Sequence, residues 1–161
     1  MTKEERDSKI EEFGGFAKAL PEALKEFPRS MWLYKPDADH WCVQEIIFHL
    51  LDTEMNLYVR YRACVAEPGK TVMPFNQDLW AMELRYKDRD VDQAIQGLIW
   101  VIQANYDLLR SLPEDDFKKT VTHPERGVQV LDYLLEIYFK HIPHHIGQMR
   151  KRLDEWKKLH P

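Results

Sequence analysis

Apolar residues recur at helical spacing along four long stretches of the chain. The first runs from Glu4 to Phe27, although Gly14, Gly15 and Pro21 predict a bend or a break within it. Its apolar positions are Ile10, Phe13, Phe16, Ala17, Leu20, Ala23, Leu24 and Phe27. The pattern predicts an amphipathic helix that buries one face.

The second apolar stretch follows a connector that runs from Pro28 to Trp41. Cys42 lies three residues before Glu45, in the place where Ser or Thr usually caps a helix, and Pro68-Gly69 should end the helix near Glu67. Its apolar positions are Ile46, Ile47, Leu50, Leu57, Tyr58, Tyr61 and Val65. We therefore expect a second long helix here.

A long irregular segment from Glu67 to Asp90 precedes the third stretch. The run from Pro74 to Trp80 lies within it, and one or two helical turns are expected after Asn76. Asp90-Val91-Asp92-Gln93 has the pattern of a capping box, and the helix that it opens should run to Leu112. The apolar face of this third helix is formed by Ile95, Leu98, Ile99, Ile102, Tyr106 and Leu109.

The fourth helix is expected from about Val128 to Leu159, after a polar connector from Pro113 to Gly127. Pro143 predicts a kink within it, because proline cannot donate to the carbonyl four residues earlier. The β-like run 120–122 is too short to found a sheet, so no strand is predicted. The four patterns together predict an all-α four-helix bundle, with residues 1–161 forming one domain and a long loop between helices two and three.

Composition narrows the class of protein. The chain has 161 residues, 44% of them apolar, which is enough for one buried core. The net charge of −4 comes from charges mixed along the sequence, so nucleic acid is a poor candidate partner. The chain has two cysteines, a charged N-terminal segment and no apolar run of about 20 residues. We therefore expect a cytoplasmic protein that does not enter the membrane.

Histidines supply the candidate chemistry. His141 and His145 lie one helical turn apart on an apolar face, about 40° apart around the axis, whereas His144 falls at the flank. Two histidines seldom hold a catalytic metal alone, and His49, at the edge of the apolar face of helix two, is the candidate third ligand. Three imidazoles would hold a divalent ion and leave a position for water, whose pKa would fall to about 7.

Two carboxylates and an amide lie near these histidines in the sequence. Glu45 precedes His49 by about one turn and Asp52 follows it by about one turn. Either carboxylate could orient a water, act as a general base or accept the Nδ1 hydrogen of His49, and the sequence does not choose among these roles. Gln148 lies within about 20° of His141 on the helical wheel and is expected to reach the pocket as a neutral hydrogen-bond donor.

An ordinary structural role is the alternative for these histidines. A lone imidazole at an apolar edge is more often a core residue than a ligand. However, burying several imidazoles without a metal requires a partner for every ring nitrogen, and each unsatisfied nitrogen costs about 1 to 3 kcal/mol. A shared metal ion removes this requirement.

Two motifs carry a family resemblance. The segment Trp41-Cys42-Val43-Gln44-Glu45 with 49–54, and the H-x-x-H-H-x-x-Q pattern within 141–149, resemble the DinB/YfiT-like superfamily of damage-inducible, metal-binding four-helix bundles. The run 74–80 is similar to a loop in one branch of that family. The resemblance implies one divalent metal, commonly zinc or nickel, held by His49, His141 and His145, often in a homodimer. Three imidazoles would also accept copper.

The resemblance also implies a small-molecule substrate. Family members include proteins described as metal-dependent hydrolases and others that act as S-transferases or isomerases with a low-molecular-weight thiol. The leading hypothesis is hydrolysis of a small amide or ester by metal-bound water. The alternatives are metal activation of an incoming thiol, and a non-catalytic bundle that binds a ligand or a structural metal.

Overall fold

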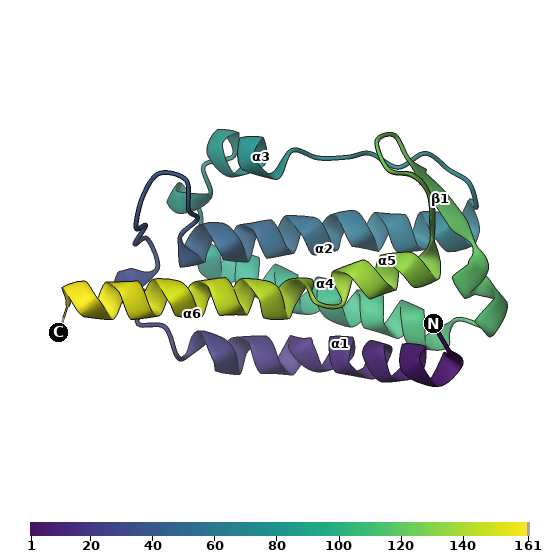
Figure 1. Ribbon diagram of the computed structural model, residues 1–161, viewed down its shortest axis with the longest axis horizontal. Coiled ribbons are helices and arrows are strands. Elements are labelled where there is room, and N and C mark those ends of the chain that lie inside the picture. The colour runs from purple at the N-terminus through teal and green to yellow at the C-terminus, as the bar shows by residue number, and fades with distance from the viewer. Residues whose placement is uncertain (161) are drawn as a thin grey trace.

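The computed structural model describes residues 1–160 and shows a four-helix bundle (Figure 1). Its long elements are α1 (Lys3–Leu24), α2 (Val43–Ala66), α4 (Val91–Ser111) and the consecutive pair α5 (Leu131–Tyr138) and α6 (His141–Leu159). The helix α4 packs against both α1 and α2, and the predicted all-α class is confirmed. No helix within residues 1–160 is long and apolar enough to cross a membrane.

Short elements connect the long helices. They are η1 (Arg29–Met31), α3 (Gln77–Glu83), η2 (Tyr86–Asp88), η3 (Glu114–Lys118), β1 (Thr120–His123) and β2 (Gly127–Val130). The side chain of Asn76 caps α3 and accepts a hydrogen bond from the Leu79 backbone N–H at 3.0 Å. The turns expected after Asn76 are therefore present, and they lie above α2 in Figure 1.

The first helix is unbroken, so the break that its glycines and proline predict as one possibility does not occur. The helix α1 continues through Gly14, Gly15 and Pro21 and ends at Leu24, before the predicted end at Phe27. The ring of Tyr106 lies against Gly14 so closely that a Cβ there would be 2.4 Å from Cδ2 of that ring. Gly14 is therefore a close-packing position between α1 and α4.

The start of α2 agrees with the sequence pattern. Cys42 is its N-cap, and a carboxylate oxygen of Glu45 accepts a hydrogen bond from the Cys42 backbone N–H at 2.8 Å. The capping box thus fixes where the helix that carries His49 begins. The apolar face predicted for this helix is buried, with Ile47 and Leu50 both fully covered.

The expectation that no strand forms was wrong. The strands β1 and β2 pair antiparallel, with Val121 opposite Gln129, and Thr71 forms an isolated parallel bridge to Thr122. Val121 is fully buried and the strand packs against α2. A run of four residues is stable as a strand here because the helix and the 67–76 segment cover it, which sequence periodicity does not report.

The predicted fourth helix is divided into two. Residues 127–130 belong to β2, so the helix begins at Leu131, and α5 and α6 are separated by a turn at residues 139–140, whose backbone dihedral angles stay in the αR region. Pro143 lies in the first turn of α6, where its missing N–H breaks no hydrogen bond within that helix. The expected kink is thus a break on the N-terminal side of Pro143, and it places His141 at the start of a helix.

Candidate metal centre

Three histidines from α2 and α6 converge on one point. The Nε2 atom of His141 lies 3.1 Å from Nε2 of His49 and 3.1 Å from Nε2 of His145. One ring nitrogen from each residue lies within 4.8 Å of the other two. The three rings meet edge to face, with centroids 4.6 to 5.0 Å apart. The structure therefore brings together the imidazoles that helical spacing singled out.

Aromatic side chains hold the orientation of these rings. Trp41 lies 4.6 Å from the centroid of His49 and stacks on His145 at 6.4 Å with an interplanar angle of 19°. Tyr138, at the end of α5, meets His141 edge to face at 6.0 Å. Close packing of this kind limits rotation of the imidazoles about their side-chain bonds.

A hydrogen-bond chain fixes the tautomer of His145. Its Nδ1 lies 2.8 Å from Oε1 of Gln148, and Nε2 of Gln148 donates to Nε2 of His144 at 3.1 Å. An amide oxygen only accepts, so Nδ1 of His145 carries the hydrogen and its Nε2 presents a lone pair to the other two histidines. Gln148 thus contacts the Nδ1 side of His145, a candidate ligand, rather than acting as the pocket donor that the helical wheel predicts.

Burial keeps the three imidazoles neutral. Burial, helped by repulsion from the neighbouring histidines, lowers the pKa of His49 to about 2 and that of His141 to about 3. Burial also lowers the pKa of His145 to about 4, although the hydrogen bond that it donates to Gln148 opposes this shift. Neutral imidazole is the form that binds a metal, so these groups need lose no proton at neutral pH.

The donor set fits one divalent cation. Two ligand nitrogens that each lie about 2.1 Å from a shared metal are about 2.9 to 3.4 Å apart in octahedral or tetrahedral geometry, and the two shortest Nε2 separations here are 3.1 Å. The Nε2 atoms of the three residues face one another and are the nitrogens placed to bind a metal ion. The Nδ1 atoms of His49 and His141 point away and are buried without a partner among the described residues.

Comparison with known proteins gives the family. Residues 14–149 match the DinB superfamily. The chain belongs to the DinB superfamily. Curated relatives from Bacillus cereus strain B4264 and Bacillus thuringiensis subsp. konkukian strain 97-27 are each 30% identical over 157 residues, which cover 96% of this chain and 90% of the relative. Both carry the name "Putative metal-dependent hydrolase". The resemblance drawn from the two sequence motifs is confirmed.

A solved structure shows the same fold. YfiT from Bacillus subtilis, described as "a probable metal-dependent hydrolase with an unusual four-helix bundle topology", is 23% identical with a TM-score of 0.89. The match covers 98% of this chain and 90% of that chain. The DinB bundle is thus the architecture in which the histidine cluster sits.

The two predicted carboxylates point to other partners in this DinB chain. Glu45 completes the capping box at Cys42 and pairs with Nζ of Lys35 at 3.3 Å. Asp52 accepts a hydrogen bond from the Tyr86 hydroxyl, and burial raises the pKa of its carboxyl. Neither carboxylate accepts a hydrogen bond from Nδ1 of His49, which has no partner among residues 1–160.

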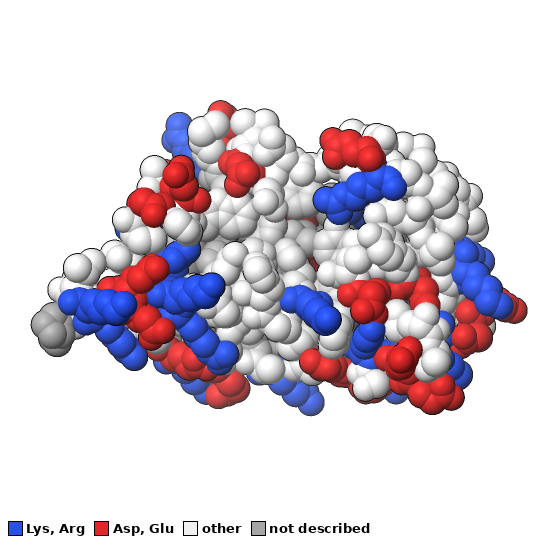
Figure 2. Space-filling model, viewed as in Figure 1, with Lys and Arg blue, Asp and Glu red and all other residues white. Residues whose placement is uncertain are grey.

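A cavity of about 380 Å³ opens beside the histidines. In Figure 2 the face of the molecule is hollowed between the part that carries α3 and the part that carries the hairpin of β1 and β2. The cavity is lined by His49, Thr53, Arg60, Pro74, Phe75, Gln77, His123, Glu125, Arg126, Ile137, Tyr138 and His141. Its size is at the lower end of ligand pockets, which suits a small molecule.

Several of these lining residues were missed from the sequence. Thr53 and Arg60 follow His49 by four and eleven residues and so lie on the same side of α2, a signal that helical spacing contains. His123 comes from β1, which was not predicted, so no pattern pointed to it. Its Nδ1 accepts backbone N–H groups of Glu125 and Arg126 at 3.2 and 3.3 Å, which leaves the hydrogen of the neutral ring on Nε2.

Proposed function

We propose that this chain is a metal-dependent hydrolase of small amides or esters, in which His49, His141 and His145 hold one zinc or nickel ion through their Nε2 atoms. The observation that carries the proposal is the convergence of these three nitrogens at the wall of a ligand-sized cavity. A structural zinc site usually has four protein ligands, and the cluster has three among the described residues. The names of the curated relatives agree with this proposal.

A divalent metal at this position supplies Lewis acidity and lowers the pKa of water to about 7. Hydrolysis of an amide breaks its C–N bond, joins the water oxygen to the carbonyl carbon and leaves the two water protons on the products. The chain must therefore orient the substrate carbonyl toward the histidines. Thr53 and Tyr138 line the cavity, and Oγ1 of Thr53 is buried with no partner among residues 1–160. The Tyr138 hydroxyl accepts a hydrogen bond from Arg60, so its own hydrogen is free to be donated to a substrate oxygen.

The base in this reaction stays a prediction. Glu45 and Asp52 are the carboxylates that the sequence offers as general base, as water-orienting group or as partner of His49, but both are engaged elsewhere and neither lines the cavity. Among the described residues that line it, Glu125 is the carboxylate. The role left for Glu45 is positioning, because it completes the cap of the helix that carries His49 and pairs with Lys35 of the connector that carries Trp41.

Elemental analysis of untagged protein tests the metal site. We expect about one divalent ion per chain in the wild type and a loss of most of it in His145→Ala, because two imidazoles rarely hold such an ion. His40→Ala is the matched control, since His40 is exposed and pairs with Asp37 in the 28–41 connector. A wild-type protein without stoichiometric metal, or a His145→Ala protein with unchanged metal content, would contradict the proposal.

Turnover measurements test the reaction. The metal-loaded protein should hydrolyse small chromogenic amides or esters, and chelation should abolish the rate. The same screen with and without a low-molecular-weight thiol separates the two chemistries that the family resemblance implies. Turnover that requires the thiol would favour S-transfer over hydrolysis, and a complete lack of turnover with metal bound would favour a non-catalytic role.

A further inference from the structure

Arg60 is a buried cation whose charge is not matched by a carboxylate. The residue is 5% exposed, and no acidic side chain of residues 1–160 forms an ion pair with it. A charge taken out of water is unfavourable unless it is paired and hydrogen-bonded. A guanidinium without an anion in the interior is therefore unusual and requires an explanation.

The hydrogen bonds of Arg60 use only part of its donor capacity. One terminal nitrogen donates to the Tyr138 hydroxyl at 3.3 Å and the other donates to the Met73 carbonyl at 2.9 Å. The Nε atom is buried with no partner among the described residues. A guanidinium has five N–H donors in one plane, so several remain available in an arrangement that matches a carboxylate.

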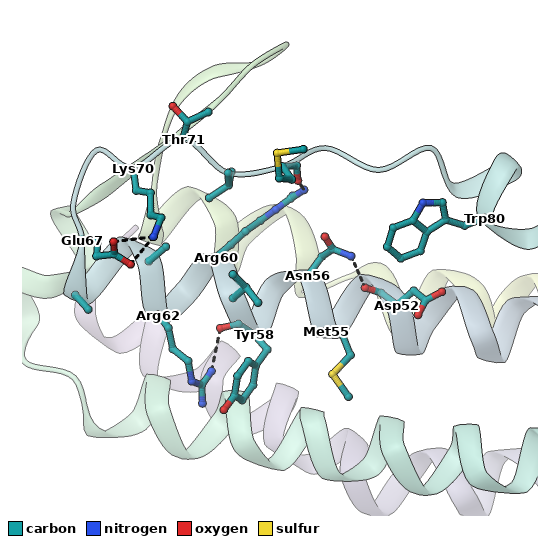
Figure 3. A pocket seen from close by; sticks show the side chains of 15 residues that line it. Asp52, Met55, Asn56, Tyr58, Arg60, Arg62, Glu67, Lys70, Thr71 and Trp80 are labelled. Carbon is teal, nitrogen blue, oxygen red and sulfur yellow. Dashed lines mark hydrogen bonds and ion pairs between the residues drawn. The ribbon is translucent and has the colours of Figure 1, made fainter. Parts of the chain in front are cut away.

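The position of Arg60 connects it to the histidine cluster. Arg60 lines the same cavity as His49 and His141, and its partner Tyr138 also contacts that cavity. Figure 3 shows a neighbouring pocket that Arg60 also lines, and in it the Arg60 side chain rises from α2 and leans toward Asn56. Arg60 and two of the three histidines thus share the lining of one cavity.

The charges of the cavity favour a monoanion. Without the proposed metal ion, two arginines, Arg60 and Arg126, and one acid, Glu125, give its lining a formal charge of +1 when the histidines are neutral. Burial lowers the pKa of His123, and Arg60 lowers it further, so this fourth imidazole adds no charge at neutral pH. One negative charge is what a carboxylate supplies, whereas a phosphate monoester brings about two.

We propose that Arg60 binds the carboxylate of a small acid that occupies this cavity, so that the substrates are amides or esters with a free carboxylate remote from the scissile bond. For the reaction, this inference rests on the proposed hydrolase function. For the preference for substrates with a free carboxylate, it rests on Arg60. A rise of about 1.5 Å per residue separates the Cα atoms of His49 and Arg60 by roughly 16 Å along α2. The carboxylate should therefore be several bonds away from the carbonyl that faces the histidines.

Binding to the metal-free full-length protein tests the anion site without any turnover. We expect glutaramate, the monoanionic monoamide of glutaric acid, to bind by calorimetry, the neutral diamide glutaramide to bind far more weakly, and Arg60→Gln to weaken glutaramate binding about 10- to 100-fold. Metal-free protein is used so that the metal cannot itself bind the carboxylate. Inorganic phosphate is measured in parallel, and tighter Arg60-dependent binding of phosphate than of glutaramate would overturn the assignment to carboxylates.

Two variants control for structural effects of the substitution. Arg60→Lys keeps the charge without the planar fork and should recover part of the glutaramate affinity. Arg62→Gln is the matched control on the same helix, because Arg62 points to the opposite side, toward α4, where it donates to the Ala104 carbonyl (Figure 3). If Arg60→Gln lowered thermal stability but left glutaramate binding unchanged, Arg60 would only tether the 67–76 segment and the proposal would fail.

Hydrolysis by the metal-loaded protein separates this inference from the proposed function. Glutaryl-4-nitroanilide should be hydrolysed at least tenfold more efficiently than its neutral glutaramyl analogue, and Arg60→Gln should remove this preference chiefly through KM. Equal hydrolysis of both probes would overturn the role of Arg60 while leaving the hydrolase proposal intact. Glutaramate binding through Arg60 without hydrolysis of any probe would support the anion site and overturn the hydrolase proposal.

Discussion

Gln148 is the residue that decides how His145 presents itself to a metal. The hydrogen bond from Nδ1 of His145 to Oε1 of Gln148 leaves the Nε2 lone pair facing His141. The Nδ1 atoms of His49 and His141 have no such partner among residues 1–160. His145 is therefore the ligand whose tautomer is set by a named side chain, and its affinity for metal should depend on that side chain.

Replacing Gln148 by Leu should weaken metal binding about 10- to 100-fold, because Nδ1–H of His145 loses its acceptor. Gln148→Glu keeps an acceptor and should retain or increase the affinity. Competition with a chromogenic chelator measures both constants. Gln103→Leu is the matched control, since Gln103 is exposed on α4 and donates to Asp107. If Gln148→Leu bound metal as tightly as the wild type, the tautomer would not be controlled by this contact.

The positions of the helices were predictable because each has an apolar face and residues that mark its ends. The contacts that hold the site residues in place were not predictable. Spacing identified His49, His141 and His145, since a helix converts sequence intervals into angles. It gave the angle of Gln148 but not the direction of its side chain. The break at residues 139–140 and the strand that carries His123 depend on tertiary packing, which no local pattern reports.

The interface between α1 and α4 gives a test at the scale of the element. Gly14→Ala should lower the free energy of unfolding by about 1 to 3 kcal/mol, because the new methyl group would lie 2.4 Å from Cδ2 of Tyr106. Gly15→Ala is the matched variant: nothing lies within 4 Å of a Cβ there, so it should raise that free energy by up to about 1 kcal/mol through helix propensity. Urea unfolding measures both, and equal shifts of the same sign would contradict this account of the interface.

The bundle as a whole buries ionisable groups beyond the candidate site. Glu54 is fully buried between α2 and α4, where Nδ2 of Asn105 donates to Oε2 at 3.2 Å and Oε1 has no partner among residues 1–160. Burial raises the pKa of its carboxyl to about 8. The core of the molecule thus contains a carboxyl group that is protonated at neutral pH.

Homodimer formation and a cytoplasmic location stay predictions.

Glu54 contributes stability that falls as pH rises. Between its unfolded pKa near 4.5 and its folded pKa of about 8, the folded chain holds a proton on Glu54 that the unfolded chain has released, so the contribution of Glu54 to the free energy of unfolding decreases with pH in this window. The buried histidines, whose pKa values are lowered, act in the opposite direction as pH rises toward their unfolded pKa. Glu54→Gln is neutral at every pH and keeps an amide oxygen for Asn105. The free energy of unfolding of the variant minus that of the wild type should therefore rise by about 1.4 kcal/mol per pH unit between pH 5.5 and about 7.5, as measured by urea unfolding of metal-free protein. The comparison cancels the buried histidines, which titrate alike in both proteins. A difference that does not change over this range would mean that Glu54 is ionised in the folded chain.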